Sequence, residues 1–159
     1  KAVDWICEGL EPMGDEYVNV MRQGCLTDRW VDWAPNAGKR QGAFSTRVPK
    51  DTHPFILMSY TDDIGSMSTL SHELGHSIHA YYASRAQPMV YYMYPSIISE
   101  TASNINQAMT RARFVLGDSS LGERFDRAWP LRQEVEQFEA ARTGGRLTDT
   151  RDLFVDRGS

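Results

Sequence analysis

Residues 72–76 read His-Glu-Leu-Gly-His, and they lie within a longer stretch whose apolar residues recur at three- and four-residue spacing. That spacing is typical of one face of an α-helix. The apolar positions are Ile64, Met67, Leu70, Leu74, Ile78 and Tyr81. Asp62 or Asp63 can cap the start of this helix, and Pro88 predicts its end near Ala86. The sequence therefore predicts one long helix that carries two histidines on one face.

Two histidines four residues apart, with a glutamate after the first, are typical of a catalytic zinc site. They lie one helical turn from each other, so both imidazoles can reach one ion at roughly 2.0–2.1 Å. Glu73 lies beside this face, where its carboxylate can act on a water molecule instead of binding the metal. We therefore predict one Zn²⁺ per chain, with His72 and His76 as ligands and Glu73 as the general base.

A third ligand is needed, and His79 does not fit that role. It lies seven residues after His72, about 10 Å along the helix axis, which is too far for the three side chains to converge on one ion. We expect His79 to support the site or to pack beside it. The longer zinc motif with a third histidine requires Gly at position 79 and His at 82, and the sequence has Tyr82.

Glu100, on the next predicted helix, is the favoured third ligand. It is the one acidic residue between Glu73 and Asp118. A catalytic zinc ion normally takes three protein ligands and keeps one position open. The competing candidates are His53, Asp62 and Asp63.

Helices account for most of the predicted structure. They are expected over the first thirty residues with a break at 11–14, from Pro95 to about Leu116, and over residues 120–143. Two strand-like runs, residues 42–46 and 55–60, precede the zinc helix. The helix after Pro95 is expected to bury an apolar face of Ile98, Ala102, Ile105, Met109 and Leu116. We predict a mainly α fold with a small sheet, in a single domain over residues 1–159.

Composition excludes several classes of partner. Charged residues make up 24% of the chain and the net charge is −4, which argues against binding to nucleic acid. No apolar run approaches the roughly 20 residues that span a bilayer. Two cysteines, Cys7 and Cys25, are too few for a disulfide scaffold, so we expect ordinary thiols and a cytoplasmic location.

Segments beyond the zinc motif resemble one family of zinc peptidases, that of thimet oligopeptidase and oligoendopeptidase F. They are Asp28-Arg29-Trp30-Val31-Asp32, residues 38–44, Thr52-His53-Pro54, Ser99-Glu100-Thr101-Ala102-Ser103, and Arg132-Gln133 with Phe138-Glu139, Gly145 and Leu147-Thr148. Glu100 matches the family's third zinc ligand in spacing and context, and His79 matches a histidine that is frequent in the family.

The resemblance implies a zinc-metallopeptidase core of helices with a small edge sheet beside the cleft. It also implies that the backbone of Gly42, Ala43 and Phe44 holds a peptide substrate in extended form, by adding a strand to the sheet. The alternative for these three residues is an ordinary strand and its turn.

Two departures from the family bear on activity. The family usually has an acidic residue seven positions after the third ligand, where this chain has Gln107; an amide can bind a ligating histidine but brings no charge to it. The family is also several times longer, and its tyrosine- and histidine-bearing loop lies beyond the position of Ser159. Tyr91, Tyr92 and Tyr94 are near in sequence, but nothing assigns them that role. We therefore expect a fragment or truncated relative, with a rate that could fall ~100-fold or more.

The leading hypothesis is zinc-dependent hydrolysis of short peptides. The alternative is a non-catalytic, zinc-stabilised fragment that needs missing segments, or that self-associates as a homo-oligomer through faces exposed by truncation. A redox or storage metal site is disfavoured, because no cysteine lies near the motif and a glutamate separates the histidines.

Overall fold

The computed structural model describes residues 1–40, 42–46, 52–88, 90–91 and 94–117. All of these belong to the first of two structural units, Lys1–Arg127, whereas the second unit, Ala128–Ser159, lies outside the described residues. The helix predicted over residues 120–143, the family segments from Arg132 onward, Gln41 and Tyr92 also lie outside them.

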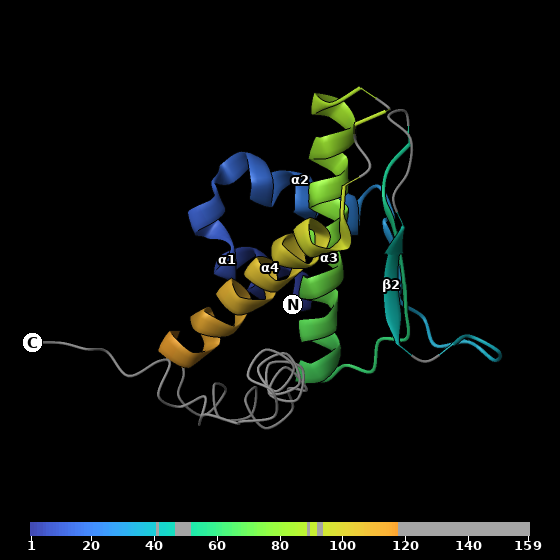
Figure 1. Ribbon diagram of the computed structural model, residues 1–159. Helices are drawn as coiled ribbons and strands as arrows, with labels where there is room; N and C mark the ends of the chain where they lie inside the picture. The colour runs from blue at the N-terminus through green and yellow to red at the C-terminus, as the bar shows by residue number, and fades with distance from the viewer. Residues whose placement is uncertain (41, 47–51, 89, 92–93, 118–159) are drawn as a thin grey trace, which may run out of the picture. The chain divides into compact units, whose positions relative to one another are not determined.

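The described residues form helices and a small sheet (Figure 1). The helices are α1 (Ala2–Gly9), the short 3-10 helix η1 (Glu11–Met13), α2 (Asp15–Leu26), α3 (Ile64–Ala86) and α4 (Ser96–Gly117). The strands are β1 (Val31–Asp32), β2 (Ala43–Thr46) and β3 (Phe55–Met58). The predicted mainly α fold with a small sheet is confirmed, and the break at residues 11–14 coincides with η1.

Helix α3 carries the zinc motif and has the predicted ends. Asp63 caps its start, since the Ser66 amide donates a hydrogen bond of 2.6 Å to the Asp63 carboxylate. The helix ends at Ala86, before Pro88. The core of its predicted stripe is buried, namely Met67, Leu70, Leu74 and Ile78. Small polar side chains on other faces are buried too, namely Ser68, Ser71, Ser77 and Ser84, because α1, α2, α4, β2 and β3 all contact this helix.

The sheet lies against α3. Its described strands have the order β1-β3-β2, with β3 parallel to β1 and antiparallel to β2. Ser45 of β2 lies opposite Ile56 of β3. The Ser45 hydroxyl also lies 2.8 Å from the Ser77 hydroxyl of α3. The two-residue strand β1 was not predicted, whereas β2 lies within the strand predicted over residues 42–46.

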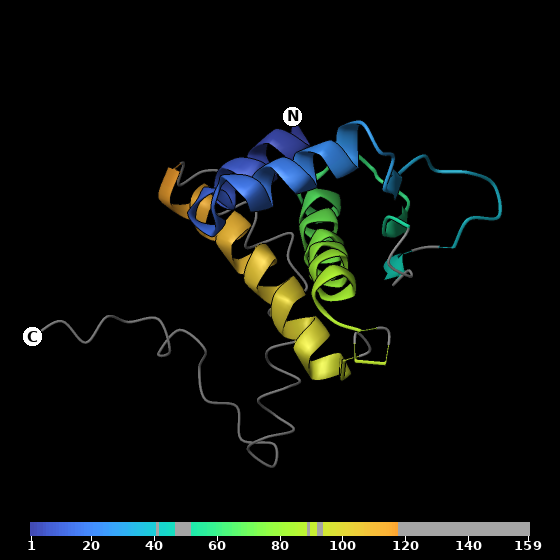
Figure 2. The ribbon, with the colours of Figure 1, turned by 90° about the horizontal axis from the view of Figure 1, so that it is seen from above.

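Helix α4 runs obliquely across α3, as two perpendicular views show (Figure 1, Figure 2). The two backbones lie close together where Gly75 meets Ser103. A Cβ atom added to Gly75 would lie 2.6 Å from the Ser103 Cα and 2.8 Å from the Ala102 carbonyl oxygen. At this position of the zinc motif, therefore, only glycine allows the observed approach of the helices.

The predicted apolar face of α4 is wrong. Ile98 is 49% exposed and Ile105 is 46% exposed, while Ala102 and Met109 are half-buried and the side chain of Leu116 lies outside the description. The buried face is instead made of Ser99, Ser103, Asn106, Gln107, Thr110 and Phe114. The close approach at Gly75 favours a small side chain at Ser103, and the larger polar side chains of this face form hydrogen bonds with α3.

Cys7 and Cys25 are buried free thiols. Burial raises the pKa of Cys25 to about 12 and raises the pKa of Cys7 as well. None of the helices in the described ranges is both long and apolar enough to cross a membrane.

Substitution of Gly75 by alanine tests the helix contact. Helix propensity alone would make Gly75→Ala stabilising by about 1 kcal/mol. Because the added methyl group would meet the backbone of α4, we expect a loss of about 1–3 kcal/mol instead. Urea denaturation measures the difference. Thr101→Ala, at an exposed position of α4, is the control and should change stability by no more than about 0.5 kcal/mol. A Gly75→Ala protein more stable than the wild type would contradict the contact.

The two thiols should be protected in the folded chain. Only a thiolate reacts readily with a disulfide reagent, and burial disfavours the thiolate of both cysteines. At pH 8 we expect no rapid reaction of the native chain with Ellman's reagent, and reaction of both thiols once urea unfolds it. Fast labelling of the native protein would show that α1 and α2 pack less closely than described.

Candidate metal centre

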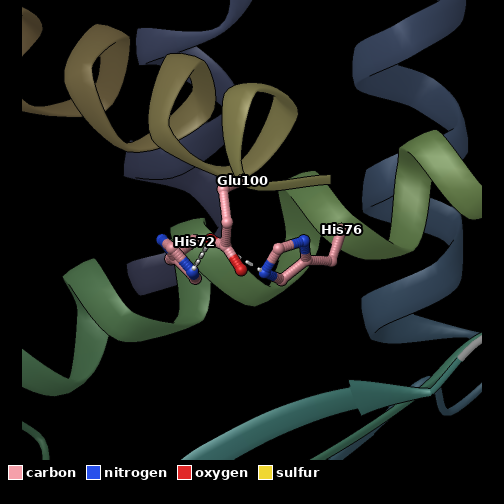
Figure 3. Close-up of side chains that lie close together, drawn as sticks. All are labelled: His72, His76 and Glu100. Carbon is pink, nitrogen blue, oxygen red and sulfur yellow. Dashed lines mark ion pairs between the residues drawn. The ribbon is translucent and has the colours of Figure 1, made fainter. Parts of the chain in front are cut away.

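His72 and His76 on α3 and Glu100 on α4 point toward one another (Figure 3). The distance from the His72 Nε2 atom to the Glu100 Oε2 atom is 3.4 Å, and from the His76 Nε2 atom it is 3.6 Å. One ligand atom from each of the three residues lies within 4.8 Å of the others. Among the described residues this is the one group of three or more metal-ligating side chains that meets that geometry.

This geometry fits a metal ion. Ligand atoms at roughly 2.0–2.1 Å from a tetrahedral centre lie about 3.3 Å from one another. The two nitrogen-to-oxygen distances, 3.4 and 3.6 Å, are close to that value. Two imidazoles and one carboxylate are also a donor set that zinc takes in catalytic sites. The cluster can therefore receive a divalent cation with small movements of three side chains.

Gln107 orients the ring of His72. Its Nε2 atom lies 3.4 Å from the Ser68 carbonyl oxygen, which can only accept a hydrogen bond. The amide nitrogen must therefore face Ser68, and the amide oxygen faces the His72 Nδ1 atom at 3.1 Å. The proton of His72 is then on Nδ1, and its Nε2 lone pair is directed toward Glu100. This tautomer is the one that a metal ligand through Nε2 requires.

His76 has a different partner. Its Nδ1 atom lies 2.9 Å from the hydroxyl of Ser99, which directly precedes Glu100 on α4. The carboxylate of Glu100 accepts a hydrogen bond from the Ser103 hydroxyl at 3.1 Å. Residues of α4 thus contact all three members of the cluster.

Glu73 is buried between α3 and β2, with only 7% of its surface exposed. Burial raises the pKa of this carboxyl group; the charge of Glu100 also raises it, whereas His72 and a hydrogen bond from the Ser45 backbone amide lower it. Glu73 is not in the three-residue cluster. It follows His72 in sequence, and its carboxyl group is close enough to His72 and Glu100 for their charges to shift its pKa.

The remaining candidate residues lie outside the cluster. The His79 ring packs on Tyr94, with ring centroids 4.1 Å apart. The His53 Nδ1 atom is 2.8 Å from the Pro54 carbonyl oxygen. Asp63 caps α3, and Asp62 precedes it in the loop. Glu100 is thus the candidate that the structure brings to the two histidines.

A cavity of about 190 Å³ adjoins the cluster on the His76 side. Its lining residues are Ser45, His76, Tyr94, Ser96, Ser99 and Glu100. Ala43 and Phe44, two of the expected substrate-binding residues, belong to the same strand as Ser45, and Gly42 precedes it with a positive φ of 94°. Ser45, Ser99 and Tyr94 were not predicted as site residues, because no residue pattern shows that a loop, a strand and two helices meet here.

Comparison with known proteins assigns the chain to a family. The model of peptidase family M3 matches residues 7–149. The chain belongs to peptidase family M3. It is 41% identical to oligopeptidase PepF of Bacillus subtilis strain 168 over 109 residues, which are 69% of the chain and 16% of that protein. It is 43% identical to an oligoendopeptidase F homolog of Borreliella burgdorferi over 107 residues, 67% of the chain and 18% of that protein.

A solved structure shows the same fold. A Chlamydophila abortus protein, assigned as a peptidase, superposes with a TM-score of 0.72 and 32% sequence identity over 92% of this chain. The match covers 27% of that protein. This M3 chain therefore spans less than a fifth of the two bacterial relatives and about a quarter of the structural one.

A substitution of Gln107 tests how the neighbour of His72 affects the zinc affinity of the cluster. Gln107→Glu places a carboxylate on the His72 Nδ1 atom and should make the imidazole a stronger ligand, so we expect tighter zinc binding by about tenfold. Asn104→Asp adds the same charge at an exposed position of α4 and is the matched control. Competition with a chromophoric chelator measures both affinities. Equal affinities of the two variants would contradict the role of Gln107.

Proposed function

We propose that this chain forms the zinc-binding, catalytic part of a peptidase that hydrolyses short peptides. The observation that carries the proposal is the cluster of His72, His76 and Glu100 with the carboxyl group of Glu73 buried beside it. Membership of peptidase family M3 and the names of the relatives, oligopeptidase and oligoendopeptidase F, support the choice of substrate class. Zinc is proposed because its preferred donors match this set.

In this proposal His72, His76 and Glu100 hold one Zn²⁺ per chain. Zinc, when bound, supplies Lewis-acid chemistry, which polarises a carbonyl group and makes water more acidic. Gln107 keeps the His72 ring in its ligating orientation. His79 acts indirectly, because it packs on Tyr94, a residue that lines the cavity beside the site.

Glu73 is the proposed general base. Its carboxylate takes a proton from the attacking water as the oxygen bonds to the scissile carbonyl carbon, and then gives a proton to the leaving nitrogen. Burial suits a group that must first accept and then release a proton, because it makes the carboxylate a better base than an exposed one.

Strand β2 is the proposed binding edge for the peptide backbone. Alternate residues of an antiparallel strand direct their amides toward the partner strand or away from it. Ile56 of β3, which lies opposite Ser45, donates its backbone amide to Trp30 and not to β2. The Ser45 amide therefore faces away from β3, and so does the amide of Ala43, two residues earlier. An extended peptide can bind there by strand addition. Gly42 would give the approach to this edge, and the half-exposed Phe44 ring would contact substrate side chains.

Other expectations stay proposals. A single catalytic domain over residues 1–159 remains a prediction, since residues 118–159 lie outside the described ranges. The free buried thiols of Cys7 and Cys25 support a reducing compartment, and we propose the cytoplasm. We propose peptides, and neither nucleic acid nor membrane, as the partners of the site.

Hydrolysis of a quenched fluorescent peptide mixture by the zinc-loaded chain tests the function. Glu73→Gln should retain one zinc per chain, because Glu73 is not a ligand, and should lower the rate by about 10²–10⁴-fold. Glu11→Gln makes the same chemical change at an exposed residue of η1 and should leave the rate unchanged.

Two outcomes would contradict the proposal in different ways. Cleavage that survives Glu73→Gln would remove Glu73 from the mechanism. A wild-type chain that holds one zinc but cleaves no peptide would favour the non-catalytic, metal-stabilised alternative.

A further inference from the structure

The two histidines of the cluster are held by α4 in chemically different ways. His72 faces an amide whose orientation Ser68 fixes, so only one tautomer of the ring fits. His76 faces a hydroxyl, the Oγ atom of Ser99, at 2.9 Å. A hydroxyl can both donate and accept a hydrogen bond, so it accommodates either tautomer of the ring. The orientation of His76 thus depends on a contact that the zinc motif itself does not reveal.

Ser99 is well placed to hold that ring. It is 7% exposed, on the face of α4 that packs against α3. It directly precedes Glu100, so one turn of α4 positions both the hydroxyl at the His76 Nδ1 atom and the carboxylate 3.6 Å from the His76 Nε2 atom. The two ends of one imidazole ring are therefore bound by adjacent residues of the same helix.

The direction of the hydrogen bond follows from what a ligand requires. Nε2 can bind a cation only through its lone pair, so the ring proton must then be on Nδ1. The Ser99 oxygen is the acceptor of that proton. Without this acceptor the Nδ1–H group would lose the hydrogen bond that it donates to Ser99, and the ring would be less firmly oriented.

We propose that Ser99 is a positioning residue of the metal centre: its hydroxyl accepts the Nδ1 proton of His76 and keeps Nε2 directed at Glu100, ready to bind a divalent cation. This inference rests on the proposed metal site. Ser99 is a neutral partner of His76, as Gln107 is of His72.

Zinc affinity of the whole chain tests the proposal. Ser99→Ala should weaken zinc binding about 10- to 100-fold in chelator competition at fixed pH. Ser96→Ala is the matched control, because Ser96 is exposed and lines the same cavity; its affinity should equal that of the wild type. Urea unfolding of both metal-free variants separates positioning from packing, and we expect unchanged stability. A Ser99→Ala affinity within twofold of the wild type would overturn the proposal.

A second measurement needs no metal. In the metal-free chain, ¹⁵N signals of the imidazole rings report which ring nitrogen carries the proton. Ser99→Ala should shift the His76 signals and leave those of His72 unchanged, since Gln107 still binds that ring. Identical His76 signals in the two proteins would overturn the role of Ser99. A wild-type chain that binds no zinc would instead overturn the proposed metal site, and the ring signals would still decide whether Ser99 orients His76.

Discussion

A backbone-to-backbone contact between α3 and α4 holds the two halves of the metal centre within reach of each other. Gly75, next to His76, faces Ser103, one turn from Glu100, and a single added carbon would lie 2.6 Å from the Ser103 Cα. Any larger residue would push α4 outward, and the Glu100 carboxylate would move with it away from both imidazoles. Ser103 also binds that carboxylate through its hydroxyl, so the residue at the contact is itself part of the support of the site.

The interface around this contact is polar, and its polarity sets the register of the helices. The Ser71 hydroxyl lies 2.8 Å from the Thr110 hydroxyl and 3.2 Å from the Asn106 carbonyl oxygen. Each such bond contributes only about 0.5–1.5 kcal/mol, but a buried group left without its partner costs about 1–3 kcal/mol. Sliding α4 by one turn would break the bonds of several buried groups together. Specific pairing, more than apolar area, therefore fixes the place at which Glu100 meets the histidines.

The sequence predicted the parts of the site that depend on local rules. The ends of α3 follow from Asp63 and Pro88, and the spacing of His72 and His76 places them on one helical face. Glu100 could be predicted because few acidic residues compete with it. The buried face of α4 could not be predicted. Helical periodicity indicated the apolar stripe through Ile98 and Ile105, whereas the close approach at Gly75 selects small residues. The contacts of Ser45 and Ser99 join segments far apart in sequence, and no spacing rule connects them.

Strand β2 is joined to α3 through the side chain of a single residue. The Ser45 hydroxyl lies 2.8 Å from that of Ser77, one helical turn after Glu73. The sheet edge and the turn of α3 that follows Glu73 are thus mechanically linked. A peptide bound to β2 as proposed would therefore strain this one contact, and the strain would reach α3 within a turn of the Glu73 carboxyl group.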